Sequence, residues 1–218
     1  RRSTDPNYGT VMQLSINYAN KFGDHSVNAM ALYEEQYNSW DNFYAQRVML
    51  LDGEYLIYGE DEEQVGSMSG AGDKSRRAFV GRVNYDYKGK YLLELSGRYD
   101  GSSRFPVNHR WGFFPSASAG WRISEEPFWK PMKNWWNMAK IRLSYGSLGN
   151  QQVSNYYYWD TISTGTLSYL LNGSSKASYA HGTVPVSSDL TWETVVTKNL
   201  GVDLGFFKNR LSVNAEAF

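Results

Sequence analysis

Apolar and polar residues alternate along most of the chain with a period of two, the spacing that places successive side chains on opposite faces of a β-strand. The pattern is clearest on both sides of Lys88-Gly89-Lys90, where apolar or small residues hold odd positions and mostly polar residues hold even ones. The alternation predicts about eight strands, joined as antiparallel neighbours. Their alternating cores are residues 13–18, 27–33, 79–87, 91–99, 116–123, 141–146, 199–206 and 211–217.

The predicted connections between these strands alternate between short and long. Tight turns are expected near residues 20–24, 88–90 and 207–210, and long polar connections near residues 36–75, 100–111 and 149–189. Successive connections of a meander fall at opposite ends of its strands, so one end of the sheet is expected to carry the short turns and the other end the long loops. Residues 124–140 are the one long connection at the end with short turns. Ser124 followed by two glutamates and Pro127 predicts a short helical insert there.

The length of the alternation indicates a membrane-crossing wall. It runs over about nine to eleven residues, beyond the usual strand length of about five or six, and matches a tilted strand that crosses a bilayer. The sequence therefore predicts an all-β fold, an antiparallel up-and-down transmembrane β-barrel segment with short periplasmic turns and long extracellular loops.

Aromatic residues make up 16% of the chain, and many gather where predicted strands meet short turns. The group comprises Tyr18, Phe22, Tyr85, Tyr87, Tyr91, Trp121, Trp129, Trp135, Trp136, Phe206 and Phe207. Such a group is typical of an aromatic girdle at a membrane interface, and the alternative is the rim of a soluble barrel core.

Composition narrows the possible functions. The 218-residue chain has no cysteine, which excludes disulfide scaffolds and Cys-ligated metal sites. Its 22 basic and 22 acidic residues balance, so no net field attracts nucleic acid, and none is expected as a partner. The mean hydropathy is −0.55, and no apolar run approaches the roughly 20 residues of a membrane-spanning helix.

Several stretches, taken in order, carry a family resemblance. Residues 82–93 read RVNYDYKGKYLL, and the chain continues with RYDGSSRF at 98–105, RWGFFPSASAGWRI at 110–123, RLSYG at 142–146 with Gly149-Asn150, and LTWET, NLGVD and NRL within 190–211. These stretches closely resemble the SusC/RagA family of TonB-dependent outer-membrane transporters. The likeness covers most of residues 76–214, and residues 1–75 fit the same architecture without a motif.

The resemblance implies a barrel of roughly 22 strands, plugged by an N-terminal domain, in the outer membrane of a Gram-negative bacterium. It implies import of oligosaccharides or peptides, with energy relayed by TonB and a SusD-like lipoprotein capping the outer mouth. Residues 1–218 are then a partial barrel domain from the middle of the wall, without a plug domain or a TonB box. The expected partners are the lipoprotein, TonB through the plug, outer-membrane lipid and the substrate. No cofactor and no enzymatic activity are expected.

Candidate contact residues fall in three groups. A loop segment offers ring faces for stacking beside a carboxylate, for substrate or for the lid protein, and its alternative role is packing against itself. Its residues are Tyr156, Tyr157, Tyr158, Trp159 and Asp160. Asp100 and Arg104 flank an outer strand end, where the alternative is a plain Asp-Gly turn. The charges expected to line the plug interface as ion pairs are Arg82, Glu94, Arg98 and Arg122.

The sequence does not contain the residue patterns typical of a catalytic or metal-binding site. The histidines lie in unrelated segments without an i, i+4 partner, so we expect no metal site. Met68 stands where a nucleophile elbow needs serine, and Asp73 interrupts a run that resembles a phosphate loop, so we interpret residues 66–75 as flexible loop. The acidic run at 60–63 lacks the spacing of a calcium loop and is expected to be solvated.

Two rival functions stay open at the level of sequence. A soluble carbohydrate-binding β-sandwich or barrel would use the apolar strand face as its core and residues 156–159 as a sugar cleft. A passive porin wall would share the barrel fold without a plug.

Overall fold

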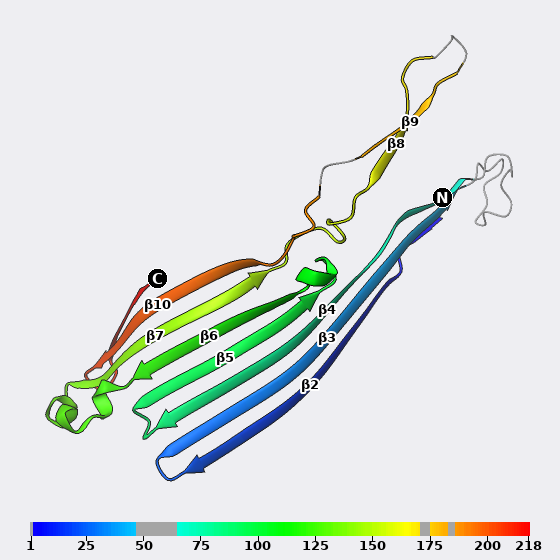
Figure 1. The fold of residues 1–218 in the computed structure, drawn as a ribbon. Helices are drawn as coiled ribbons and strands as arrows, with labels where there is room; N and C mark the ends of the chain where they lie inside the picture. The colour runs from blue at the N-terminus through cyan, green and yellow to red at the C-terminus, as the bar shows by residue number, and fades with distance from the viewer. Residues whose placement is uncertain (1, 47–64, 171–174, 183–185) are drawn as a thin grey trace.

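The computed structural model describes residues 2–46, 65–170, 175–182 and 186–218, and most of their regular structure is β-strand. One large sheet dominates (Figure 1). Its strands are β1 (Arg2–Thr4), β2 (Asn7–Phe22), β3 (His25–Gln46), β4 (Val65–Tyr87), β5 (Tyr91–Ser102), β6 (Trp111–Trp121), β7 (Trp136–Asn150), β10 (Glu193–Phe206) and β11 (Leu211–Ala217). A separate hairpin consists of β8 (Ile162–Thr166) and β9 (Ser178–Gly182).

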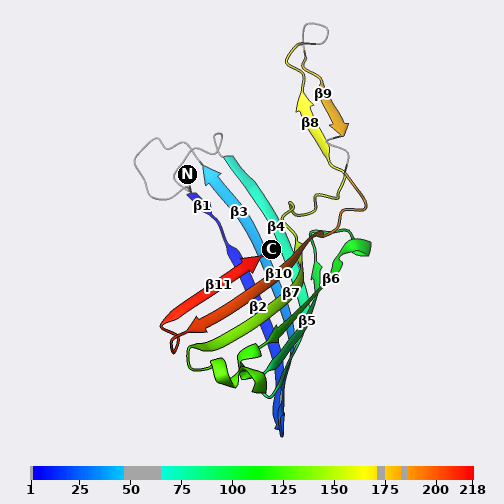
Figure 2. The same ribbon diagram turned by 90° about the vertical axis from the view of Figure 1, so that its left-hand side faces the viewer.

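The strands of the large sheet pair in antiparallel fashion, in the order in which they follow one another along the chain. β1 and β2 both pair with β3, one after the other along the same edge, so nine strands occupy eight positions. This confirms the predicted up-and-down order and strand number. The sheet curves without closing on itself (Figure 2), as expected for part of a barrel wall.

Three tight turns join strand pairs at one end of the sheet, which we call the short-turn end (Figure 1). Gly23 has a φ of 59°, and Lys88 and Gly89 have φ values of 56° and 66°. The third turn holds three consecutive residues with positive φ, Phe207, Lys208 and Asn209. Positive φ gives a hairpin turn the twist of its flanking strands. The short turns predicted near 20–24, 88–90 and 207–210 are therefore confirmed.

At the opposite end, two strands run further than the sequence indicated. β3 and β4 remain paired as far as Gln46 and Val65, so most of the predicted loop at 36–75 is strand. The interpretation of residues 66–75 as flexible loop was therefore wrong. The alternation is lost there because this part of β4 is mostly small and polar and the aromatic residues of β3, such as Trp40 and Phe43, do not keep one phase. The backbone ladder continues because each N–H and C=O group still needs a partner. The acidic run at 60–63 lies outside the described residues.

The remaining connections combine long loops with short helical turns. Residues 103–110, which include η3 (Val107–His109), join β5 to β6, and residues 151–192 join β7 to β10 and carry the β8–β9 hairpin. The predicted helical insert is a pair of 3-10 helices, η4 (Ile123–Glu125) and η5 (Pro127–Met132). Pro131, inside η5, lacks the N–H that a longer helix needs. In the described ranges, no helix has the length and apolar character required to cross a membrane.

The strand register gives the sheet two unlike faces. On the apolar face, Val83, Leu95 and Ala117 lie side by side on β4, β5 and β6. On the polar face, the neighbouring positions include Ser96 and Ser116, whose hydroxyl oxygens are 2.6 Å apart. The phase predicted from the alternation is therefore confirmed, with each strand presenting one apolar and one polar side.

The apolar face is left open to its surroundings. Leu14 is 65% exposed, Ile16 is 69% exposed and Leu143 is 55% exposed. A β-sandwich would bury such side chains against a second sheet, and the described residues supply no second sheet for this face. The fold therefore does not support the soluble sandwich.

A small core lies at the long-loop end, in phase with the polar face. Phe105, Phe114 and Trp192 are buried together, with ring centroids 5.0 Å apart for Phe105 and Trp192 and 5.3 Å apart for Phe114 and Trp192. The indole Nε1 of Trp192 donates to the carbonyl oxygen of Arg110 at 2.9 Å. We call loops 103–110 and 151–161, with the adjoining strand ends, the rim. This core holds both loops against β6.

Candidate functional site: the polar face and the rim

Aromatic side chains form a row along the strand ends at the short-turn end. Tyr87, Tyr91 and Trp121 stand on neighbouring strands, with ring centroids 6.3 and 6.4 Å apart. Trp136 stacks on Phe206 at 5.4 Å further along the sheet. These residues belong to the group predicted as an aromatic girdle, and the structure gathers them in two sets at the short-turn end, which we call together the first row.

A second aromatic row crosses the apolar face nearer the long-loop end, and the sequence analysis missed it. Phe79 lies 5.2 Å from Tyr33, and Tyr99 stacks on Trp111 at 4.8 Å. On the four strands β3 to β6, an aromatic or histidine ring recurs eight residues from the ring beside the short-turn end, as Tyr91 and Tyr99 do. Eight residues span about 26 Å along a strand, which at barrel tilt is roughly 20 Å of height. This i, i+8 repeat is the signal that could have revealed both rows.

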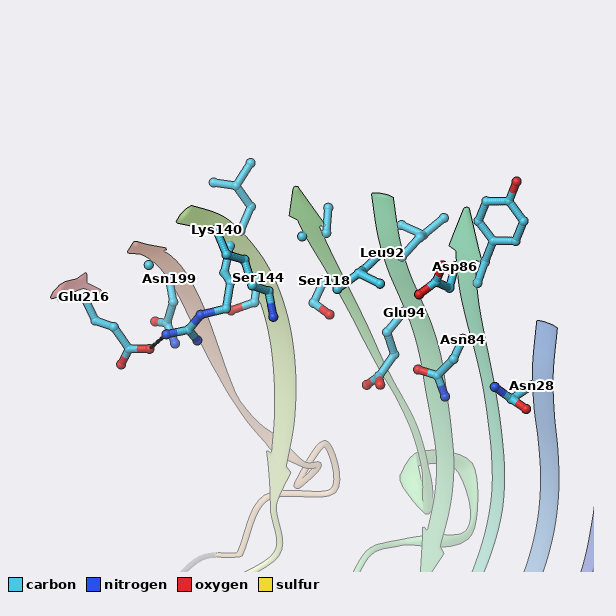
Figure 3. A pocket seen from close by; sticks show the side chains of 17 residues that line it. Asn28, Asn84, Asp86, Leu92, Glu94, Ser118, Lys140, Ser144, Asn199 and Glu216 are labelled. Atoms are coloured by element: carbon cyan, nitrogen blue, oxygen red, sulfur yellow. Dashed lines mark hydrogen bonds and ion pairs between the residues drawn. The ribbon is translucent and has the colours of Figure 1, made fainter. Parts of the chain in front are cut away.

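A broad hollow, which we call the basin, lies on the polar face near the short-turn end, with a volume of about 460 Å³ (Figure 3). Polar side chains from seven neighbouring strands point into it, and they are Asn28, Asn84, Glu94, Ser118, Ser144, Asn199 and Glu216. Arg142 donates to Asp203 Oδ2 at 2.8 Å and to Glu216 Oε1 at 2.7 Å. Three charged residues that line the basin, Glu94, Arg142 and Glu216, are thus paired with a charge on another strand.

A network of charged residues continues along the polar face toward the rim. Glu34 accepts from Arg76 at 2.6 Å and from Gln13 at 2.6 Å. Arg98 pairs with Asp100 at 2.6 Å and lies 3.9 Å from Glu34. These ion pairs tie β3, β4 and β5 together across the face.

The four charges predicted to face the lumen do not share one environment. Arg82 and Glu94 lie 4.0 Å apart on the polar face. Arg98 belongs to the Glu34 network nearer the rim, where it pairs with Asp100. Arg122 lies beyond the end of β6 and donates to the Gly89 carbonyl oxygen at 3.1 Å, within the short-turn end. Contact of these side chains with a plug domain stays a prediction.

Asp100 and Arg104 are separated by the end of a strand. Asp100 and Gly101 lie within β5 and pair with β4 and β6, so the alternative of a plain Asp-Gly turn is wrong. The Trp111 ring lies across Gly101, where any larger side chain would meet it. Arg104 is in the rim, where its Nε donates to Asn155 Oδ1 at 3.1 Å.

The aromatic loop segment packs partly on itself and partly on β4. Tyr156 stacks on Trp159 with ring centroids 4.6 Å apart, and its hydroxyl donates to Asp73 Oδ1. This bond and partial burial raise the pKa of Tyr156 to about 12. Tyr157 is 51% exposed and Trp159 is 57% exposed, so ring surface remains for a partner. Binding of substrate or lid protein by residues 156–160 stays a prediction.

Glu126 organises the short-turn end, and the sequence analysis did not single it out. Although only 9% exposed, it accepts from Tyr91 at 2.7 Å, from Lys90 at 3.0 Å and from Trp121 at 3.3 Å. The Tyr91 hydrogen bond, with Lys90 next, lowers the pKa of Glu126 below its usual value. The glutamate thus fastens the insert between β6 and β7 to the β4–β5 turn.

The family comparison matches the whole chain, because the model of the TonB dependent receptor-like β-barrel covers residues 1–218. The chain belongs to this family. The β-barrel family explains the strand order, the two faces and the open edges of the sheet together, since a partial wall has neighbours on both sides.

Individual relatives support the same assignment. The chain is 32% identical over 207 residues to TonB-dependent receptor P39 of Formosa agariphila, covering 93% of this chain and 19% of that protein. It is 33% identical over 149 residues to TonB-dependent receptor SusC of Bacteroides thetaiotaomicron, covering 65% of this chain and 14% of SusC. The chain therefore spans less than a quarter of the length of these relatives.

Solved structures share the fold. The chain superposes on the RagAB peptide importer in its closed-closed state with a TM-score of 0.78 and 22% identity, covering 98% of this chain and 23% of that one. The open-open state gives a TM-score of 0.76. Together with the match to SusC, this confirms the resemblance to the SusC/RagA family that the sequence stretches carried.

Proposed function

We propose that residues 1–218 are part of the wall of an outer-membrane active transporter that imports oligosaccharides or peptides. In this proposal the rest of the barrel, a plug domain and a TonB-linked energy supply belong to the full-length protein, and a SusD-like lipoprotein covers the outer mouth. The family assignment supports the barrel. The names of relatives, receptors and an importer, support transport rather than enzymatic chemistry.

The observation that carries the proposal is the exposed apolar face between two aromatic rows. Leu95, at its centre, is four residues from Tyr91 in one row and four residues from Tyr99 in the other, and it is 49% exposed. Such a band, with aromatic girdles on both sides, is the surface that an outer-membrane barrel presents to lipid. The polar face then lines the interior, with paired charges against the plug and the rim toward the outer mouth.

The experiment uses the full-length gene in its host. An antibody against the chain should detect a protein several times larger than 24.9 kDa in the outer-membrane fraction, and deletion of the gene should abolish uptake of one substrate class. A soluble band near 24.9 kDa would overturn the proposal. Growth of the deletion strain on oligosaccharides and on peptides, each as the sole nutrient of its kind, identifies the class imported.

A further inference from the structure

A second hollow, which we call the rim pocket, lies on the polar face beside the rim. Its volume is about 170 Å³, and its lining is polar throughout. The main lining residues are Gln36, Asn38, Lys74, Arg76, Ser102 and Arg104, and Ser75 and Gln151 complete the wall. The lining has three cations and no carboxylate, so a small group enclosed there meets hydrogen-bond donors and positive charge from several sides.

Much of the positive charge in the rim pocket is not neutralised. Among the described residues, Lys74 and Arg104 take part in no ion pair. Arg76 is paired with Glu34 at 2.6 Å, yet its Nε is buried without a hydrogen-bond partner. A buried donor without a partner costs free energy. Lys74 and Arg104 are therefore the cations of the lining that remain available to a ligand.

The rim holds the pocket side chains in place before any ligand binds. Arg104 donates through Nε to Asn155 Oδ1 at 3.1 Å and through Nη1 to the Gln151 carbonyl oxygen at 2.8 Å, which leaves Nη2 for a ligand. The loop is fixed to β4 by Ser103 N to Ser75 O and by Ser75 N to Ser103 Oγ, both at 3.0 Å. Fixed donors lose little conformational freedom on binding, which favours affinity.

We propose that the rim pocket binds a carboxylate group of the transported substrate, and so selects acidic substrates. The inference rests on the proposed transport function and narrows its substrate class. The anionic oxygens face Lys74 Nζ and Arg104 Nη2, and a guanidinium group presents planar donors suited to such groups. An acidic oligosaccharide and a peptide with a free carboxyl terminus share this chemistry.

The position of the pocket along the strands fits an early encounter with substrate. Arg76 and Lys74 lie three and five residues beyond Phe79 of the second aromatic row, on the side of the long loops. A molecule that enters from the long-loop end therefore reaches the rim pocket before it reaches the basin.

The test measures binding to the full-length transporter, purified with its lipoprotein partner, by calorimetry. Two matched probe pairs are used: oligogalacturonate with its methyl-esterified form, and one peptide with a free or an amidated carboxyl terminus. The variant is Lys74→Met, which removes charge and keeps length. Lys21→Met is the matched control, because Lys21 lies on the polar strand phase of β2 at the short-turn end and has no ion pair among the described residues.

We expect the acidic member of one pair to bind, with an affinity that falls as salt is added. Lys74→Met should weaken that binding about ten-fold, the loss expected for one charge-assisted hydrogen bond, and Lys21→Met should not. Arg104→Lys, which keeps the charge but loses the fork of donors, should weaken it as well. The pair whose acidic member binds tells an acidic saccharide from a peptide.

Three results would overturn the pocket assignment: acidic and neutral forms that bind equally, an acidic probe whose affinity Lys74→Met leaves unchanged, or no binding of any probe. Failure of the transport function itself is recognised separately, by a protein that is absent from the outer membrane or a deletion that affects no uptake.

Discussion

The wall and the rim are made from the same strands, yet they use polar residues differently. We use wall for the part of the sheet that runs from the second aromatic row to the short-turn end. In the wall, Arg142 forms ion pairs with Asp203 and Glu216. In the rim, Lys74 and Arg104 have no acidic partner among the described residues. Paired charges hold neighbouring strands in register, whereas unpaired charges are available to a molecule that the chain does not contain.

Apolar packing separates the two regions as well. The described residues leave the apolar side chains of the wall exposed, and the rim has a buried cluster of Phe105, Phe114 and Trp192. In the proposed transporter the wall therefore depends on lipid for stability, and the rim depends on contacts between its own loops. Substitutions that affect one region and spare the other test this division.

The largest effect is expected at the centre of the wall. Leu95→Arg places a charge midway between the aromatic rows, and should destabilise the full-length transporter by about 2–4 kcal/mol if that position lies near the bilayer midplane. The measurement is denaturant-induced unfolding in phospholipid vesicles. Ser118→Arg is the control, because Ser118 lies beside Glu94 on the polar face, where an arginine finds a carboxylate. Equal losses at both positions would disprove the assignment of the faces.

Packing at the rim gives the next largest effect. A methyl group added at Gly149 would overlap the Phe114 ring, so Gly149→Ala should cost about 1–3 kcal/mol, as overpacking of a core does. Gly81, on the apolar face of the wall, has no atom near the position of a new methyl group. Gly81→Ala should therefore be neutral or slightly stabilising in the same unfolding experiment. If both glycines tolerate alanine equally, the rim is not packed as described.

Much of the wall could be predicted from sequence because its determinants are local. Lipid on one side and a polar interior on the other act on each residue in turn, so Leu93 and Glu94 reveal their faces by position alone. The second aromatic row was equally local, in the repeat from Tyr91 to Tyr99, but the predicted girdle included only the aromatic residues beside the short turns. Strand ends were predicted less well, since the ladder of β3 and β4 continues through polar residues that carry no alternation.

Glu126 gives a test of the contact between the helical insert and the β4–β5 turn at the short-turn end. Glu126 has a pKa below its usual value of 4.5, so its contribution to stability is present above that value and is lost as pH falls through the lower, folded pKa. We expect the wild-type transporter to lose stability below about pH 4.5 more steeply than Glu126→Gln does. Thermal unfolding in detergent between pH 3 and 6 measures the difference. Parallel curves for the two proteins would mean that the bonds from Lys90 and Tyr91 do not stabilise the fold.

The candidate site was harder to predict than the wall because it depends on loops that meet only in three dimensions. Nothing near Arg104 in sequence indicates that Lys74 shares its pocket, and nothing near Glu126 indicates its bonds to Lys90 and Tyr91. Asp100 was interpreted from the turn preference of Asp-Gly, which the pairing of β5 with both neighbours overrides. Local patterns place a residue on a face, and only the register of the strands shows which residues face one another.

The smallest effect concerns the contact of the rim loop with β4. The hydrogen bond to Asp73 favours the neutral phenol of Tyr156 and raises its pKa to about 12 from the usual 10. The stability that this bond contributes is therefore present below pH 10 and is lost as pH rises through 12. The ultraviolet titration difference between wild type and Tyr156→Phe should show one phenol that ionises near pH 12. Asp73→Asn should move that ionisation to lower pH, and Tyr157→Phe, which removes an exposed phenol from the same loop, is the control. A phenol that is lost in Tyr156→Phe yet ionises near pH 10 would show that the loop does not rest on β4, and the rim would then lack one of the contacts that distinguish it from the wall.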